Sequence, residues 1–484
     1  VSYLPKSLAE LQALAQINMA FNPLGDEVPR ELCELKGLRV LNFDYTGVKV
    51  IPDAMGNLRN LETLQASGNP FEYPFNLLYF RDPMLLVRFF CPDTTELNLS
   101  GCGLQTVPRS IALLKSLERL DLSDNNIVSL PVELGELKNL TELNLEGNPL
   151  EYPFRQLRCD DFGNARTVHF LNTDIQELNL SQAALVDIPP LLLRHTQHLQ
   201  ALNLASNRIK MLPDEFSELK MLTNLTLDNN GFKYFPEAVC SLVNLEVLHF
   251  SRNRFEALPA SICDLTALQQ LVVGSNELLE LPSELVHMAS LEILVCSNNS
   301  LKALPEGLGG LQRLRVLDCG CNDIAALPAS VGMLKALEVL DMRINEVAGV
   351  PEEISECTSL VELDLSNNEI PALPEAMAGL KELAMLRLGA NPLEQLPLRL
   401  CTGLSGLQEL QLFGNPLPNV PSSMNVRGGE ECARLLGLLE NIFRRQEFLE
   451  GDSPETVPEE QSPNRPQGPA AGAKPRPSRP VSYT

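Results

Sequence analysis

A 23-residue pattern that recurs along almost the whole chain constrains the fold more than any other feature of the sequence. Residues 117–139, LERLDLSDNNIVSLPVELGELKN, form a representative copy. The alternation in Leu120, Asp121 and Leu122 places two leucines on one face of a short strand. The other aliphatic positions, with a Leu-Pro step among them, fit a tight bend and a partly helical return. One unit cannot bury these side chains alone, so the copies must stack.

An asparagine follows nearly every expected strand. Its side-chain amide can hydrogen-bond backbone groups where the chain turns away from the sheet. The seventeen residues at this position are Asn22, Thr46, Asn69, Cys102, Asn125, Asn148, Ala183, Asn207, Asn230, Asn253, Asn276, Asn299, Asn322, Asn345, Asn368, Asn391 and Asn415. Fourteen of them are asparagine, which predicts a ladder of buried amides along the stack.

With a fixed period and a fixed Leu/Asn code, the chain resembles leucine-rich repeat proteins over about residues 1–450. The Leu-Pro step and the repeat length are similar to the intracellular Ras-suppressor type, which includes plant Ras-group-related proteins. The resemblance implies an α/β fold: a leucine-rich repeat solenoid shaped as a curved horseshoe. A parallel sheet would line its concave face, with 3-10 and short helices on the convex face.

Charge and cysteine usage narrow the class of partner. The formal net charge of −24 argues against nucleic acid and anionic membrane surfaces, which attract basic patches. The 12 cysteines are scattered, so we expect buried thiols, with Cys296 and Cys319 stacked in the core of adjacent repeats. No apolar run is long enough to span a bilayer, and no signal peptide is evident. We expect a cytoplasmic monomer without membrane insertion.

The period breaks twice, between Asn69 and Cys102 and between Asn148 and Ala183. Each break opens on a related segment, GNPFEYPF at 68–75 and GNPLEYPF at 147–154. We expect helical insertions near 70–95 and 149–175, with short helices at 82–90 and 162–171 that bulge from the solenoid. The alternative is functional, with a partner docking on these protrusions.

The two ends differ from the middle. The solenoid is expected over residues 1–420, and a capping helix within 421–450. Residues 451–484 are rich in proline and lack an aliphatic pattern, so we expect a disordered tail. In that tail Lys474, Pro477 and Pro480 match the spacing of an SH3 ligand. At the other end residues 3–11 read as the second half of a repeat, which favours a longer parent chain.

A search for catalytic or cofactor sites finds little. No phosphate-binding loop, zinc-protease motif or kinase signature occurs. His195 and His198 lack further metal ligands nearby, so we interpret them as solvated helix residues. Cys319 and Cys321 form a C-x-C pair in which one thiol should point into the core. We therefore expect neither an enzyme nor a cofactor or metal site.

The concave face remains as the candidate partner-binding surface, because its outward side chains do not fill the core. An amide-rich N-terminal half gives way to an apolar patch, followed by acids and then arginines. Apolar patches with polar rims often mark interfaces. The candidate partner-binding residues are His249, Arg252, Val272, Ile293, Val295, Arg343 and Arg387.

These features predict a non-catalytic protein-protein interaction scaffold in intracellular signalling. The resemblance implies a small GTPase or a phosphatase catalytic subunit as partner. Arg166, Val168 and Phe170 are similar to the R-x-V-x-F phosphatase docking motif, although they fall in an expected helix. The alternative is the recognition arm of a larger multidomain enzyme, such as a kinase-GTPase or a ubiquitin ligase, whose catalytic part lies outside this chain.

Overall fold

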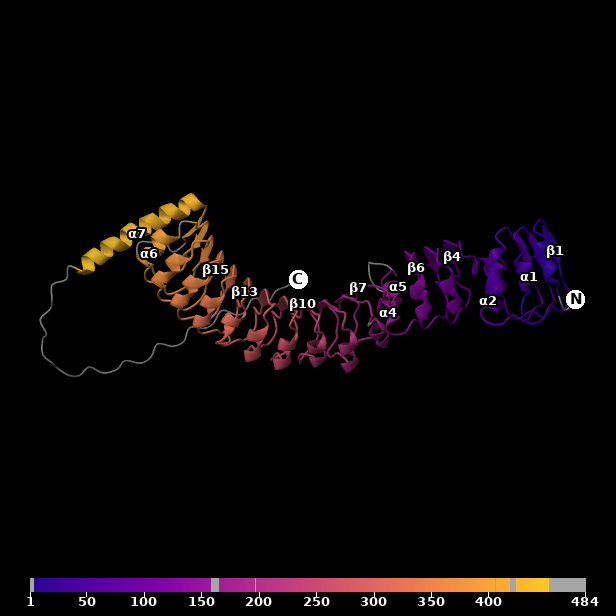
Figure 1. The fold of residues 1–484 in the computed structure, drawn as a ribbon, viewed down its shortest axis with the longest axis horizontal. Helices are drawn as coiled ribbons and strands as arrows, with labels where there is room; N and C mark the ends of the chain where they lie inside the picture. The colour runs from indigo at the N-terminus through magenta and orange to yellow at the C-terminus, as the bar shows by residue number, and fades with distance from the viewer. Residues whose placement is uncertain (1–3, 158–164, 196, 405, 418–423, 452–484) are drawn as a thin grey trace.

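The computed structural model describes residues 4–157, 165–195, 197–404, 406–417 and 424–451, with only the backbone for 442–451. The chain forms a long arc in which short parallel strands line the inner side and short helices the outer side (Figure 1). The expected curved solenoid is therefore confirmed. Its sheet is divided in three, with β1 to β3, β4 to β6 and β7 to β18 each forming a separate sheet.

The strands are three residues each, and those of one sheet pair in parallel with identical register, except for the antiparallel β18. They are β1 Gln16–Asn18, β2 Val40–Asn42, β3 Thr63–Gln65, β4 Glu96–Asn98, β5 Arg119–Asp121, β6 Glu142–Asn144, β7 Glu177–Asn179, β8 Ala201–Asn203, β9 Asn224–Thr226, β10 Val247–His249, β11 Gln270–Val272, β12 Ile293–Val295, β13 Val316–Asp318, β14 Val339–Asp341, β15 Glu362–Asp364, β16 Met385–Arg387, β17 Glu409–Gln411 and β18 Asn425–Arg427.

The outer side is built from 3-10 and short α-helices. The α-helices are α1 Arg30–Cys33, α2 Phe75–Arg81, α3 Leu85–Arg88, α4 Phe154–Leu157, α5 Ala165–Leu171, α6 Leu398–Gly403 and α7 Gly429–Gly451. The 3-10 helices are η1 Lys6–Glu10, η2 Asp53–Asn57, η3 Arg109–Leu113, η4 Val132–Glu136, η5 Pro190–Arg194, η6 Asp214–Glu218, η7 Glu237–Ser241, η8 Ala260–Asp264, η9 Ser283–His287, η10 Leu308–Gly310, η11 Ala329–Met333, η12 Glu352–Glu356 and η13 Glu375–Gly379.

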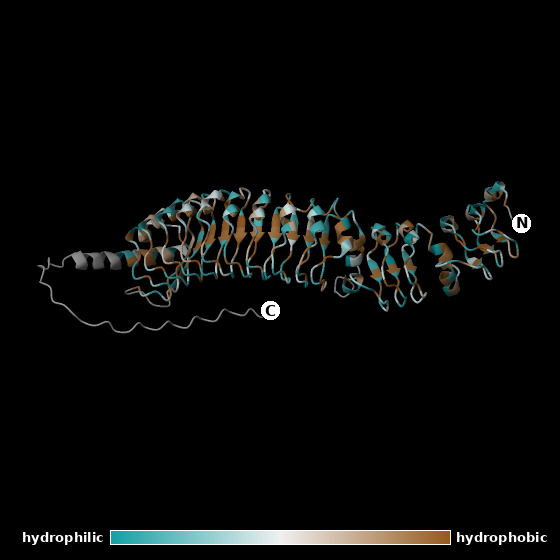
Figure 2. Cartoon of the chain, turned by 90° about the horizontal axis from the view of Figure 1, so that it is seen from below, coloured by the Kyte–Doolittle hydropathy of each residue, from teal (hydrophilic) through white to brown (hydrophobic). Residues whose placement is uncertain are grey.

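The Leu-Pro step explains where the outer helices begin. Pro259 is extended at φ −70° and directly precedes η8, a position where its missing N–H costs no helical bond. Ile262 from η8 and Leu271 from β11 then belong to the same hydrophobic core, and both are fully buried. Every repeat adds such a slice, which gives the apolar colour that runs through the strands (Figure 2). In the same core the Sγ atoms of Cys296 and Cys319 lie 3.2 Å apart, as their strand positions predict.

The asparagine ladder is confirmed in detail. Asn299 is fully buried, and its amide donates to the carbonyl oxygens of Val273 (3.1 Å) and Cys296 (2.9 Å). Its Oδ1 accepts the N–H of Leu278 at 3.0 Å. Each asparagine amide thus forms hydrogen bonds both within its own turn and with the preceding repeat. Where threonine replaces asparagine at Thr46, the hydroxyl keeps the bond to the Phe43 carbonyl, at 2.8 Å, and also lies 2.9 Å from Asn69 Oδ1.

The helices at the two breaks pack into the stack, so the expectation that they bulge from it is wrong. α5 lies against η4 as one outer helix lies against the next. Val168 and Phe170 in α5 are buried, as are Leu86 and Phe89 at the first break. Their apolar side chains continue the core where the strand ladder is interrupted, because exposing them to water would cost more than packing them.

The C-terminal end closes with α6, β18 and α7. α7 contacts α6, β17 and β18, and β18 pairs with β17. β18 is an antiparallel strand that the repeat pattern does not predict. α7 buries Cys432, Leu435, Leu436 and Leu439 against the last repeats. These residues remove the final core slice from solvent, the role of a polar-faced terminal cap in a solenoid.

Candidate protein-binding surface

The structure brings three of the sequence-predicted residues into one row on the sheet. His249, Val272 and Val295 are register partners on the neighbouring strands β10, β11 and β12. Their side chains alternate with the buried leucines Leu248 and Leu294 and therefore face the concave side. All three are half-buried, so the core does not depend on their chemistry.

A second apolar row runs beside the first. A prediction that considers only the residue after each inward-facing leucine misses most of this row. Ile293 pairs with Val316, and Val316 pairs with Val339, so these three form a continuous line across β12, β13 and β14. Val247 holds the same position on β10. The residue just before each inward-facing leucine carries the signal that would have found them. We call the six residues Val247, Val272, Ile293, Val295, Val316 and Val339 the concave apolar surface.

Carboxylates continue the first row beyond Val295. Asp318, Asp341 and Asp364 follow in register on β13, β14 and β15. Oδ1 of Asp318 accepts the Gly320 N–H at 3.0 Å, and its Oδ2 accepts the Ser297 hydroxyl at 2.8 Å. Burial raises the pKa of Asp341 to about 6, and the neighbouring carboxylates Asp318 and Asp364 add to the rise.

The two arginines, Arg343 and Arg387, differ in the solvent exposure of their side chains. Arg387 has only 23% of its side chain exposed, and its guanidinium contacts Glu362, Glu409 (3.2 Å) and Asp364 (3.9 Å). It therefore balances charges within the sheet. Arg343 is 50% exposed, with Nε 3.4 Å from Asp341 Oδ2. Of this pair, Arg343 is the more accessible.

His249 and Arg252 border the apolar rows near β9 and β10. Burial raises the pKa of Asp228, and the charges of His249 and Arg252 partly oppose the rise. Oδ1 of Asp228 accepts the Ser251 N–H at 2.6 Å. Arg252 is exposed and sits at the bend with a positive φ of 56°. The apolar rows are thus flanked by a basic group at β10 and by carboxylates from β13 onward.

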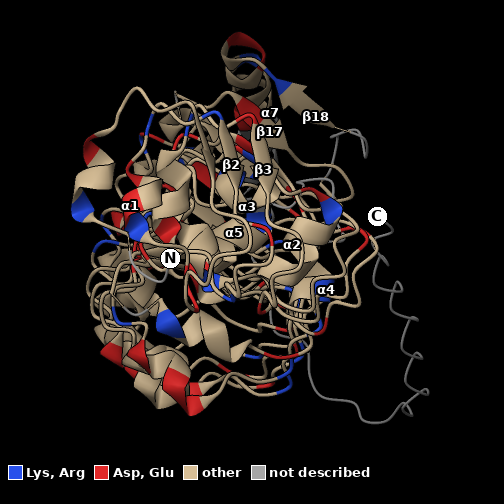
Figure 3. Ribbon diagram, turned by 90° about the vertical axis from the view of Figure 1, so that its right-hand side faces the viewer, with Lys and Arg blue, Asp and Glu red and all other residues tan. Residues whose placement is uncertain are grey.

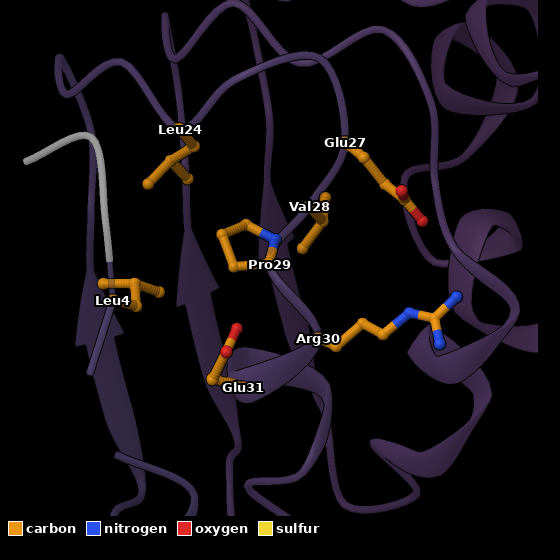
Figure 4. A pocket seen from close by; sticks show the side chains of 7 residues that line it. All are labelled: Leu4, Leu24, Glu27, Val28, Pro29, Arg30 and Glu31. Atoms are coloured by element: carbon orange, nitrogen blue, oxygen red, sulfur yellow. The ribbon is translucent and has the colours of Figure 1, made fainter. Parts of the chain in front are cut away.

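Other parts of the described chain offer little for chemistry. A hollow of about 260 Å³ lies near the N-terminal end, where Leu4, Leu24 and Pro29 face a common space (Figure 4). It is smaller than the roughly 300–1,000 Å³ of usual ligand pockets, whereas two hollows beside the outer helices η5 to η8 have volumes of about 600 and 550 Å³. Among the described residues, no group of three or more His, Cys, Asp and Glu could hold a metal ion. Acidic and basic residues are interspersed around the solenoid (Figure 3).

His195 and the R-x-V-x-F sequence meet at the second break. The interpretation of His195 as a solvated residue is wrong, because it is 1% exposed and its Nε2 lies 2.8 Å from the Phe170 carbonyl oxygen. Burial lowers its pKa. Arg166, Val168 and Phe170 lie in α5 and are all buried, so they cannot bind as an extended strand. The SH3-type residues Lys474, Pro477 and Pro480 fall outside the described residues.

The helices and cysteines of the described part of the chain bear on membrane insertion and redox chemistry. No helix there is both long and apolar enough to cross a bilayer. Its cysteines carry free thiols, and most of these are buried. Burial raises the pKa of Cys33 to about 12 and that of Cys357 to about 11, which keeps both thiols protonated and unreactive.

Family models match three parts of the chain. A leucine-rich repeat region model matches residues 178–295 and 240–342. Two leucine-rich repeat models match residues 92–150 and 356–370. These segments coincide with strands and outer helices of the stack, so the repeats are leucine-rich repeats and the fold is a leucine-rich repeat solenoid.

Curated relatives match only parts of their own length. The human leucine-rich repeat protein 1 is 34% identical over 113 residues, which is 23% of this chain and 25% of the relative. A probable serine/threonine-protein kinase of Dictyostelium discoideum is 33% identical over 189 residues, 34% of this chain and 6% of the relative. The chain thus spans a quarter or less of either protein.

Solved structures with similar folds come from bacteria and plants. A leucine-rich repeat protein of Leptospira interrogans aligns with a TM-score of 0.47 and 27% identity, covering 91% of both chains. The ectodomain of the Arabidopsis receptor kinase HAESA, solved with a peptide hormone ligand, aligns with a TM-score of 0.48 and 26% identity, covering 82% of this chain and 66% of that one.

Proposed function

We propose that this chain is a non-catalytic scaffold that binds protein partners on its concave face. One observation carries the proposal. Five aliphatic side chains on β11 to β14 form two adjacent rows, and Val247 on β10 is the sixth member of the surface. All six lie on the concave side of the sheet, where they do not fill the core. Apolar rows that are only half-buried and have a charged rim are typical of interfaces. A rigid sheet also presents them without an ordering cost on binding.

The partner-binding residues in this proposal are the concave apolar surface with His249, Arg252 and Arg343 at its margins. Arg387 is not included, because its guanidinium already forms ion pairs with three carboxylates of the sheet. Replacing Arg387 would therefore lower the stability of the sheet more than it would weaken the binding of a partner. The proposal therefore centres on β10 to β14.

We also propose an intracellular signalling role, with a small GTPase or a phosphatase catalytic subunit as candidate partner. The free thiols of the described residues fit a reducing compartment. The similarity to the Ras-suppressor type supports these two partner classes. The burial of Val168 and Phe170 argues against recruitment of a phosphatase through the R-x-V-x-F sequence, so such a partner would have to use the concave face.

Replacing Val272 and Val295 by serine in the full chain tests the scaffold proposal. A matched control carries serine at Val186 and Val243, two valines outside the strands that are 47% and 49% exposed. Both variants should melt like wild type, because neither pair fills the core. Partners recovered from cell extract and identified by mass spectrometry should be lost only with V272S/V295S, since truncating central interface residues costs about 2 kcal/mol or more each. Equal recovery by both variants would refute the proposal.

A second proposal is that the chain is the recognition arm of a larger multidomain enzyme. Its support is that the relatives include a probable kinase and an adenylate cyclase, of which the chain covers 6% and 9%. Sequencing the full-length transcript tests it. A reading frame encoding a catalytic domain next to these repeats would favour the arm over the free-standing scaffold, and a frame without one would refute it.

A further inference from the structure

The apolar rows and the carboxylate row are parts of one continuous surface. Val295 on β12 is the register partner of Asp318 on β13, and Asp318 is the partner of Asp341 on β14. Val316 and Val339 lie on the same two strands as these acids, one residue before the buried leucine. A ligand that covers the valines on β13 and β14 therefore also covers Asp318 and Asp341.

The charges on this surface are unequally balanced. Asp364, at the far end of the row, is buried and lies 3.9 Å from the Arg387 guanidinium. Asp341 has the exposed Arg343 at 3.4 Å, on a side chain that a partner can displace into water. Asp318 accepts bonds from neutral groups, the Gly320 N–H and the Ser297 hydroxyl. The two acids nearest the valines thus carry more negative charge than their surroundings neutralise.

We propose that the concave apolar surface binds a protein segment in which aliphatic side chains are followed by a lysine or arginine. The aliphatic groups lie on Val272, Ile293 and Val295, and the cation lies between Asp318 and Asp341. This assignment rests on the proposed scaffold function and specifies its partner. Charge complementarity selects the occupant, because an acidic segment would place like charges on a half-buried carboxylate row.

Strand spacing sets the expected length of the motif. Neighbouring strands are about 4.8 Å apart, so the middle of β11 and β12 lies roughly 10 Å from the middle of β13 and β14. An extended peptide advances about 3.3 Å per residue, so the cation should lie about three residues from the middle of an aliphatic pair, which is about two residues after the second aliphatic anchor and on the same face of the peptide. Two aliphatic residues two positions apart would place their side chains on the same face toward the valines.

The test uses the full chain and a random peptide library displayed on phage. Selection is run on wild type, on D318N/D341N and on V272S/V295S. Asparagine keeps Oδ1 as the acceptor for the Gly320 and Arg343 N–H groups, so D318N/D341N should melt like wild type. Wild type should enrich peptides with aliphatic residues followed about two positions later by Lys or Arg.

Synthetic copies of the enriched peptides, labelled with fluorescein, then give affinities by anisotropy. D318N/D341N should weaken binding about tenfold or more and flatten its dependence on salt, as expected for the loss of charge-assisted contacts. Replacing the peptide cation by norleucine should remove the difference between wild type and the variant.

The outcomes separate this inference from the scaffold proposal. If V272S/V295S abolishes binding while D318N/D341N leaves affinity and salt dependence unchanged, the scaffold stands and the cationic partner is wrong. Enrichment of acidic or uncharged peptides, or no enrichment over the carrier phage, also overturns the inference. Self-association of wild type that V272S/V295S abolishes would place a second copy on the surface, and would overturn it as well.

Discussion

Replacing Asn299 by alanine tests the interaction that repeats through the whole solenoid. The side chain makes four hydrogen bonds, three of them to carbonyl oxygens that also accept another N–H. The Ser297 carbonyl, which accepts from Asn299 Nδ2 at 3.4 Å, also accepts the Ser275 N–H at 2.8 Å. The Val273 carbonyl also accepts from the Asn276 amide at 3.0 Å, and the Cys296 carbonyl also accepts from the Asn322 amide at 3.1 Å. The N–H of Leu278 depends on Asn299 Oδ1, at 3.0 Å.

The expected loss follows from this count. Leaving a buried N–H unpaired costs about 1–3 kcal/mol, and water cannot replace the lost acceptor because Asn299 is 0% exposed. Each of the three carbonyls retains another N–H donor and adds little. We therefore expect Asn299→Ala to lower the free energy of unfolding by about 1–3 kcal/mol.

Urea or guanidinium denaturation followed by circular dichroism measures the change. Asn244→Ala is a suitable control, because the Asn244 amide donates to the Lys220 carbonyl at 2.8 Å on an exposed turn. Its loss should cost at most about 0.5 kcal/mol, the usual range for surface substitutions. If both variants unfold at the same denaturant concentration with equal slopes, the ladder does not stabilise the fold.

Three further predictions follow from other contacts. Arg387→Met should destabilise the fold by about 1.5–3 kcal/mol, because it removes charge-assisted bonds to Glu362 and Glu409; an unchanged denaturation midpoint would contradict this. Burial lowers the pKa of His195 below its ordinary 6.5, so folding excludes a proton and stability should fall as pH drops below about 6.5. His195→Gln should weaken that pH dependence in thermal melts, and an identical pH profile would count against it. Deleting residues 452–484 should leave the melting temperature unchanged, because this proline-rich segment has too few apolar residues to add to the core; earlier melting would show that it packs.

Local patterns in the sequence are sufficient to predict the repeat, the inward-facing residues of each strand and the amide ladder. Leu294 faces inward and Val295 outward because side chains alternate along any strand. Asn299 bonds its own turn and the previous repeat because every copy places an amide at the same point. The stacking of Cys296 on Cys319 follows from the same register. These features depend only on local backbone geometry, so the residues of a single repeat are enough to specify them.

The two breaks in the repeat period show where the local sequence pattern is insufficient to predict the tertiary packing. The sequence predicts helices at 82–90 and 162–171 that bulge from the solenoid, whereas α3 and α5 pack against η2 and η4. Nothing in a short amphipathic segment says which neighbouring surface will cover its apolar side. His195 is a further case, because a histidine on a short helix is buried only when the Phe170 carbonyl comes within hydrogen-bond distance from 25 residues away.

The candidate surface was partly visible in the sequence and was completed only by the fold. His249, Val272 and Val295 are predictable as concave residues from strand alternation, and the structure makes them register partners. The second row through Val316 and Val339, and the engagement of Arg387 by three carboxylates, depend on which strands lie side by side. Alternation fixes only the face on which a side chain lies. Its neighbours come from repeats 23 residues away, so the tertiary structure decides which groups share a surface and which charges are already balanced.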